Sequence, residues 1–491
     1  MIFPMMFLSL IVLMGGALDL SKHRSESVLI QAALDATALG IIQETDLADA
    51  EVPQLAREFF DLNSKGIVAN IQNFSAVRAN NMVSVQVEAD VNTFFMGLVG
   101  IETLPIFVKV ESLAAGNTRE IALVLDTTSS MSGSRLEDLK SATNLLLDRL
   151  EEGSPVITGN FRVGIVPFNE FVRVNPSDFP DAWLDDEGRS APALEIFNEE
   201  VDILELFDHL GEDWEGCLRS RSGDLAYTDT GIITGDPDTR FLPLFAYDEA
   251  DDGSYLNNYI TDTVTHPDGI SSVSSLLKYG ITPGDGATPS LWSPVSHTIG
   301  GNFGPNRNCT SEPIKPLTTD FATIRNTVDN LTAEGDTQLT EGLIWGQRIL
   351  SNRAPYTDAL PINTEGNEKV LILLSDGINS IDGGNADLRS ALNTHGYAGI
   401  GEQATLLPPA PVEDDINDFL DDEFAEACEH IKEEGTQLIV IRLELNDPDS
   451  LDLLRNCASG AENFFDATDS SQLEGIFTEL AERVTSPRLT R

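Results

Sequence analysis

The chain has 491 residues, of which 80 are acidic and 30 basic, so its formal net charge at pH 7 is −50. A chain of this length is expected to form more than one domain. Its content of 41% apolar and 22% charged residues is ordinary for globular proteins and excludes a wholly disordered chain. The negative charge repels phosphate backbones and argues against nucleic-acid binding. It attracts cations, although a hydrated surface suited to salty surroundings is the simpler interpretation.

The N-terminal segment 1–18 carries no charged residue, and Asp19, Lys22 and Arg24 follow directly. As a helix, this segment rises about 27 Å, close to the thickness of the hydrocarbon core of a bilayer. A cleaved signal peptide would have a basic start and a small-residue cleavage site, and neither is evident. We therefore predict an uncleaved transmembrane anchor at 1–20. By the positive-inside rule alone, the basic residues after the anchor would place the rest of the chain in the cytoplasm, unless a basic leader precedes the given start.

The chain contains four cysteines, none of them in a C-x-x-C pair or at a zinc-binding spacing from a histidine. An even number of cysteines in an exported chain indicates disulfides. Of the three possible pairings we favour Cys217–Cys309 and Cys428–Cys457, because each pair falls within one region of the chain. Four unpaired buried thiols are the alternative.

After the anchor, residues 20–62 are rich in helix-favouring side chains. Residues 82–95 alternate valine with polar residues, which predicts a strand, and a second strand is expected at 105–114. The region 21–115 is therefore predicted to be a helix that carries a small antiparallel sheet.

From residue 119 onward, buried strands and amphipathic helices alternate. Strands are predicted at 120–126, 161–168, 370–375 and 437–445, and helices at 136–150, 321–331, 339–350, 418–435 and 471–484. This order predicts a doubly wound, mostly parallel α/β sheet over 119–485. Residues 172–317 lack regular periodicity, and we interpret them as a large insertion after the second strand.

Three segments with oxygen-bearing side chains follow predicted strands or precede a predicted helix. Asp126, Thr128 and Ser130 alternate after the first strand, Thr337 lies in the loop Gly335-Asp336-Thr337, and Asp376 follows the strand 370–375. Ligands bind at the carboxyl ends of the strands in open parallel sheets, so we expect these five side chains to converge. An all-oxygen set suits a hard divalent cation, of which Mg²⁺ fits best, with Mn²⁺ or Ca²⁺ as alternatives. Each segment taken alone is an ordinary helix cap or turn.

The motifs LVLDTTSSM, GDT followed by GL, and LLSDG, in this order, resemble the von Willebrand factor A domain and its metal-ion-dependent adhesion site (MIDAS). The resemblance implies that Asp126, Thr128 and Ser130 form the D-x-S-x-S motif, with Thr337 and Asp376 as the remaining ligands. It further implies that the two aspartates often reach the metal through water, whereas the hydroxyls coordinate directly. Thr128 replaces the usual serine and keeps the hydroxyl.

Further segments, among them LIQAALDATALG, WEGC, GLIWGQRILS and FFDATDSSQLEGIF, resemble TadG-like proteins of tight-adherence (Flp) pilus assembly. This resemblance covers nearly the whole chain. It implies a single-pass inner-membrane anchor with the bulk of the chain in the bacterial periplasm or at the cell surface, and a basic leader missing from the given start. The implied partners are proteins of the pilus-assembly machinery that offer an acidic side chain to the metal.

Three functions remain open at the level of sequence. The first is a membrane-anchored, non-enzymatic adhesion scaffold that binds partners through the metal. The second is a metal-dependent hydrolase at the same edge of the sheet, for which no histidine lies near the three motifs as a general base. The third is a structural spacer with a vestigial metal site.

Overall fold

The computed structural model describes residues 2–44, 47–79, 82–113, 118–152, 161–197, 200–249, 257–260, 279, 303–364, 366–381, 392–397, 406–407, 413–444, 448–485 and 489–490. The chain divides into two compact units. Unit 1 comprises residues 1–118, 149–160 and 481–491, and unit 2 comprises residues 119–148 and 161–480.

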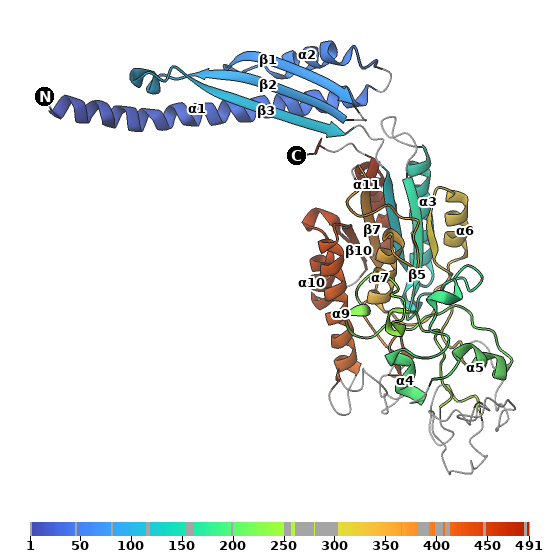
Figure 1. Ribbon diagram of the computed structural model, residues 1–491. Helices are drawn as coiled ribbons and strands as arrows, with labels where there is room; N and C mark the ends of the chain where they lie inside the picture. The colour runs from blue at the N-terminus through green and yellow to red at the C-terminus, as the bar shows by residue number, and fades with distance from the viewer. Residues whose placement is uncertain are drawn as a thin grey trace. The chain divides into compact units, whose positions relative to one another are not determined.

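Unit 1 combines two helices with an antiparallel sheet (Figure 1). Helix α1 (Ile2–Gln43) is a single continuous helix, and α2 (Val52–Asn63) packs against it. The sheet has the order β1-β2-β3-β12. Its strands are β1 (Asn70–Ala79), β2 (Met82–Asn92), β3 (Thr103–Leu113) and β12 (Leu489–Thr490).

The core of unit 1 follows from the alternation in β2. Val83, Val85 and Val87 are buried on one face of the sheet and pack with apolar residues of α1 and α2, such as Leu34 and Phe60. The helical stretch expected over 20–62 is two helices instead of one. Pro53 lies in the first turn of α2, where its missing N–H has no partner to lose.

Unit 2 is built on a six-stranded sheet with the order β11-β10-β7-β4-β5-β6. Five of the strands are parallel, and the edge strand β6 runs antiparallel to β5, so the sheet is mixed. Every residue of β4 is buried, which shows that both faces of the sheet are covered. The strands are β4 (Arg119–Asp126), β5 (Phe161–Phe168), β6 (Lys315–Thr318), β7 (Glu368–Ser375), β10 (Gln437–Leu443) and β11 (Phe464–Ala467). A separate short hairpin is formed by β8 (Leu392–Asn393) and β9 (Gly396–Tyr397).

The helices of unit 2 connect these strands. They are α3 (Ser134–Glu152), α4 (Ala191–Phe197), α5 (Ile203–Leu210), α6 (Phe321–Asn330), α7 (Leu339–Leu350), α9 (Glu413–Glu433), α10 (Pro448–Cys457) and α11 (Leu473–Thr485), of which α3 and α11 end in unit 1. All twelve residues of α7 are buried. A Cβ atom at Gly346 would lie 2.5 Å from a methyl carbon of Val124 in β4, so this glycine lets the helix approach the sheet closely.

The segment 172–317, expected to be an insertion, contributes to the main core of unit 2. Its described part holds α4, α5 and several 3₁₀ turns, and it ends in the edge strand β6. Phe179 and Phe241 from this segment contact Trp345 of α7, with ring centroids 6.5 and 4.9 Å apart. The aromatic side chains of the insertion therefore cover the same helix that lies on the sheet.

Two disulfides lie within unit 2, in the pairing favoured from the sequence. Cys217 is bonded to Cys309 across the insertion, and Cys428 of α9 is bonded to Cys457 of α10. Because these are the only cysteines in the chain, no free thiol remains.

Candidate metal site at the carboxyl ends of β4 and β7

The site lies where the sheet reverses its direction of winding. The chain passes from β4 through α3 to its neighbour β5, and from β7 through α9 to its neighbour β10 on the opposite side. Such crossovers are right-handed in nearly all proteins, so the reversal places α3 and α9 on opposite faces and leaves a crevice between β4 and β7. Leu125 pairs with Leu374, which puts Asp126 beside Ser375 at this crevice.

A chain of short hydrogen bonds joins four of the five predicted ligands. Asp126 Oδ1 accepts the Thr128 N–H at 2.9 Å, and the Thr128 and Ser130 hydroxyl oxygens lie 2.9 Å apart. The Ser130 hydroxyl donates to Asp376 Oδ1 at 2.6 Å. Asp126, Thr128 and Asp376 are buried, whereas Ser130 is exposed. The site therefore opens to solvent at Ser130.

The fifth predicted ligand, Thr337, belongs to a loop that contacts both other segments. The Gly335 carbonyl accepts the Ser129 N–H at 3.0 Å. The Thr337 carbonyl accepts the Ser380 N–H at 3.0 Å, and a Cβ atom at Gly377 would lie 2.9 Å from the Thr337 hydroxyl. The structure therefore places the Thr337 side chain next to the residue that follows Asp376.

Burial raises the pKa of both carboxyl groups at this site. Burial, followed by the negative charge of Asp376, raises the pKa of Asp126 to about 7. Burial also raises the pKa of Asp376, although the Ser130 hydroxyl and the Arg135 guanidinium oppose this effect. Two like charges in a desolvated crevice favour binding of a cation, because the cation offsets both the repulsion and the lost hydration.

A basic residue that was not predicted from the sequence, Arg135, also lies at this site. Arg135 Nη1 lies 2.8 Å from Asp376 Oδ2, and its Nε lies 2.7 Å from Glu444 Oε2, just after β10. The hydrogen bond from Arg135 lowers the pKa of Glu444. The sequence around Arg135 could not predict its contact with Glu444, because the two residues are more than 300 positions apart in the chain. Ser375 was also missed, and its hydroxyl donates to Asp126 Oδ2.

A cavity of about 500 Å³ lies beside the candidate metal site and shares Ser129 and Gly335 with its loops. The buried carboxyl of Glu170 lines it together with Asp336, Arg307 and Asn308. Asn308 Nδ2 donates to Glu170 Oε2 at 2.7 Å. Burial and the nearby Asp336 raise the pKa of Glu170 to about 8. The cavity is therefore polar and carries both acidic and basic groups.

The residues present fit a hard divalent cation. The five converging side chains offer only carboxylate and hydroxyl oxygens, which are the donors that Mg²⁺ prefers, and none of the five is a softer imidazole or thiol ligand. The buried carboxylate pair supplies a negative charge that Arg135 matches only in part. The exposed position of Ser130 leaves one side of the site open to a further ligand.

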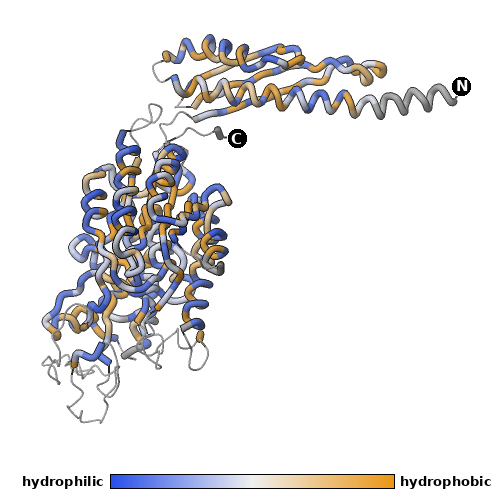
Figure 2. The backbone as a smooth tube through the Cα atoms, turned by 180° about the vertical axis from the view of Figure 1, so that it is seen from behind, coloured by the Kyte–Doolittle hydropathy of each residue, from blue (hydrophilic) through white to orange (hydrophobic). Residues whose placement is uncertain are grey.

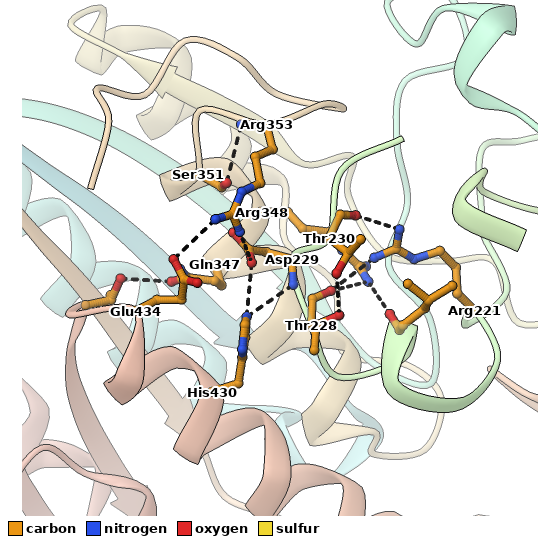
Figure 3. Close-up of polar contacts among 12 residues, drawn as sticks. Arg221, Thr228, Asp229, Thr230, Gln347, Arg348, Ser351, Arg353, His430 and Glu434 are labelled. Carbon is orange, nitrogen blue, oxygen red and sulfur yellow. Dashed lines mark hydrogen bonds and ion pairs between the residues drawn. The ribbon is translucent and has the colours of Figure 1, made fainter. Parts of the chain in front are cut away.

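A second acidic group lies between the insertion and α9 and was not predicted from the sequence (Figure 3). The ligand atoms of Asp229, His430 and Glu434 all lie within 4.8 Å of one another. Arg353 already bridges two of them, with Nη1 at 2.6 Å from Asp229 Oδ1 and Nη2 at 3.5 Å from Glu434 Oε2. Burial acts to raise the pKa of Asp229, but hydrogen bonds from His430 and Ser351 and the charge of Arg353 lower it overall. This group is a charge-matched network that joins the insertion to α9.

No family model matches the chain, and no curated protein matches its sequence. Among solved structures, the backbone is similar to the pilus adhesin SpaC from Lactobacillus rhamnosus GG, with a TM-score of 0.33 and 11% identity over 84% of this chain. The chain spans about a third of SpaC, at 33% of its length. The vWF domain of the type V pili tip protein Mfa5 from Porphyromonas gingivalis gives a TM-score of 0.35 and 11% identity, covering 75% of this chain and 95% of that domain. Proximal thread matrix protein 1 from the mussel byssus, with a zinc-occupied MIDAS motif, gives 0.30 and 13%, covering 76% of this chain and 48% of that one.

Proposed function

We propose that this protein is a membrane-anchored, non-enzymatic scaffold that binds a protein partner through a divalent cation. The observation that supports this most strongly is that five oxygen-bearing side chains, two of them buried carboxylates, lie close together at the point where the sheet reverses. Asp126, Thr128, Ser130, Thr337 and Asp376 would hold the cation. We propose Mg²⁺, with Mn²⁺ or Ca²⁺ as alternatives.

A bound divalent cation supplies a coordination position for an acidic side chain of the partner. The residues of this chain prepare that position. Asp126 and Asp376 provide the charge, Ser130 marks the open side, and Arg135 holds the Asp376 carboxylate in place. The neighbouring cavity with Glu170 and Arg307 would receive polar groups that flank the partner's acidic residue.

The binding role is better supported than hydrolysis. A hydrolase at this site would need an activated nucleophile or a base that is free to take a proton. The hydroxyls of Thr128 and Ser130 are hydrogen-bonded to each other. The carboxylate of Asp376 accepts hydrogen bonds from both Ser130 and Arg135.

The place of action follows from the resemblance of the sequence to TadG-like proteins. We propose that α1 anchors the chain in the bacterial inner membrane and that the bulk of the chain, with its disulfides, lies in the periplasm and serves the assembly or anchoring of a tight-adherence pilus. The support from the structure is that one helix among the described residues is long and apolar enough to cross a membrane, over Gly15–Ile42 of α1, together with two disulfides. This span overlaps the predicted anchor 1–20 only at residues 15–20, and its later part packs in the core of unit 1.

The experiment compares the full chain in detergent with two isosteric variants, in millimolar Mg²⁺ and in chelator at constant ionic strength. Asp126→Asn removes a ligand charge. Asp185→Asn is the matched control, because Asp185 is equally buried and accepts backbone N–H groups outside the site. We expect Mg²⁺ to raise the melting temperature of the wild type and of Asp185→Asn but not of Asp126→Asn, since a ligand that binds only the folded state stabilises it.

The same three proteins, immobilised and exposed to native envelope extract, test the partner. Proteins retained in Mg²⁺, released by chelator and absent from the Asp126→Asn sample would be metal-bridged partners. If Mg²⁺ shifts no melting temperature, the metal mechanism is wrong and the spacer function takes its place. If the metal binds but the retained proteins are the same for all three samples, the partner does not bind through the metal.

A further inference from the structure

The loop that joins β2 to β3 exposes an apolar surface in unit 1. Its sequence, FFMGLVGI over 94–101, contains no charge. Phe94 is 77% exposed and Leu98 60% exposed, and Val99 and Ile101 are also exposed. The hydrophobic colouring of this loop is visible in Figure 2. Exposed apolar residues clustered in one short loop mark an interaction site more often than a random feature of the surface.

The loop is held firmly beside α1 (Figure 1). The Asp19 carboxylate accepts the N–H groups of Phe94, Phe95 and Met96 at 3.0, 2.9 and 2.8 Å. Gly15 allows the close approach, because a Cβ atom there would lie 2.1 Å from the Phe95 ring.

These hydrogen bonds satisfy polar groups of the loop that would otherwise make contact with lipid unfavourable. Three backbone N–H donors of the loop and the single carboxylate of Asp19 satisfy one another, and Asp19 is buried. An N–H group without an acceptor is strongly unfavourable in hydrocarbon. At the base of the loop, the Thr93 hydroxyl donates a hydrogen bond to the Glu102 carbonyl at 3.1 Å and so joins the two ends of the loop. The exposed tip of the loop therefore offers mainly apolar side chains.

The position of the loop along α1 indicates that its apolar side chains contact the lipid bilayer. The uncharged part of α1 ends at Leu18, and its rise of about 27 Å is slightly less than the hydrocarbon thickness of about 30 Å. A short span draws its own last residues, Gly15 to Leu18, and Asp19 directly after them to the boundary of the bilayer, together with the loop that Gly15 and Asp19 contact. Aromatic and aliphatic side chains next to polar groups are typical of this interface.

We propose that the loop 94–101 inserts into the interface of the lipid bilayer and forms a second membrane contact beside α1. This inference rests on the membrane anchor of the proposed function. Together, the helix and the loop fix the rotation and tilt of unit 1 at the membrane surface, which a single helix leaves free.

The test places one fluorophore at a time on the full chain, reconstituted in vesicles of neutral phospholipid. All four native cysteines are in disulfides, so an introduced cysteine is the only free thiol. Leu98→Cys carries an environment-sensitive dye into the loop. Leu62→Cys on α2 is the matched control in the same unit, with an exposed fraction of 62% for the native leucine. Leu8→Cys reports on the anchor itself.

Some of the vesicles contain lipids with a nitroxide quencher near the top of the acyl chain, at a depth of about 5–10 Å below the head groups. We expect strong quenching and a blue-shifted spectrum for the dye at position 98, and neither for the dye at position 62. If position 8 is protected inside the bilayer and position 98 is unquenched, the loop inference is overturned while the anchor stands. If position 8 is not protected, the anchor fails, and the inference fails with it.

A second copy of the chain covering the loop would give a different result. The dye at position 98 would then be blue-shifted but unquenched by the labelled lipid, and its spectrum would change when the chain is diluted with unlabelled lipid. That outcome would overturn the lipid contact.

Discussion

The pair Asp126 and Asp376 shows how single residues prepare the site for a cation. Both carboxylates are buried and lie in one crevice, so both have a raised pKa. Only the second of them is paired with a basic side chain, Arg135. Asp126 therefore carries the larger part of the cost that a bound metal would remove.

At this scale we predict that the metal-free protein loses stability as the pH rises from about 4 to about 7. The folded-state pKa of Asp126, about 7, is above the ordinary value of 3.8. Between these values the folded chain binds more protons than the unfolded chain, so each step toward higher pH favours unfolding. The full effect is on the order of a few kcal/mol. Calorimetric melts in chelator over this pH range measure it.

The controls for this prediction distinguish the contribution of Asp126 to the pH dependence of stability from that of Glu170 in the neighbouring cavity. Asp126→Asn should flatten the pH dependence in chelator, and Mg²⁺ should flatten it in the wild type, since the metal needs the ionised carboxylates. Glu170→Gln removes the other carboxyl with a strongly raised pKa and should leave the contribution of Asp126 unchanged. An unaltered slope in Asp126→Asn would contradict the assigned cause.

The sequence was sufficient to propose the five ligands because their residue types and order form a recognisable pattern. The structure brings these residues together, as the contacts from Asp126 to Asp376 and from Thr337 to Gly377 show. Arg135, Glu444 and Glu170 could not be predicted. Their roles depend on pairings between distant segments, and in a chain with 80 acidic residues a single glutamate carries no signal.

At the scale of elements, the long buried strands and amphipathic helices were predictable, and the short ones were not. The helix expected at 339–350 is α7 with the same bounds, and the strands expected at 120–126 and 161–168 correspond to β4 and β5. The strands β6 and β11 have only four residues each, too few to show a period. β1 was missed because it has five polar residues among ten and no regular alternation.

The contact of α7 with the sheet gives a prediction for an element. Gly346→Val should destabilise unit 2 by about 1–3 kcal/mol, because the added atoms have no space beside Val124 and Leu371. Gly475→Ala in α11 is the control. No atom lies within 4 Å of its added Cβ, so this change should stabilise the helix by about 0.5–1 kcal/mol. Urea titration of both variants measures the two free energies. Equal effects would show that the close packing of α7 is not the cause.

At the scale of the whole molecule, the net charge of −50 is the dominant electrostatic feature. Mutual repulsion of surface carboxylates opposes the compact state. We predict that sodium chloride raises the melting temperature in chelator at pH 7.5, because the screening length falls from about 10 Å at 0.1 M to about 3 Å at 1 M salt.

The control for this prediction is the same salt titration at a lower pH. At about pH 4 many of the carboxyl groups are protonated, so the same increase in salt should have a much smaller effect. An equal rise at both pH values would show that the salt acts by another route, such as exclusion from the protein surface.

The strands that precede and follow unit 2 along the chain belong to one sheet. The chain leaves the sheet of unit 1 after β3 and returns to it at β12, where Leu489 pairs with Ser112. Unit 2 therefore lies within unit 1 along the sequence, and the chain passes between the two units at four points, after residues 118, 148, 160 and 480. In the scaffold proposed above, a pulling force on a bound partner would be shared among these crossings, and a proteolytic cut in one of them would leave unit 2 joined to unit 1 through the others. This multiple connection would act as a safeguard against shedding.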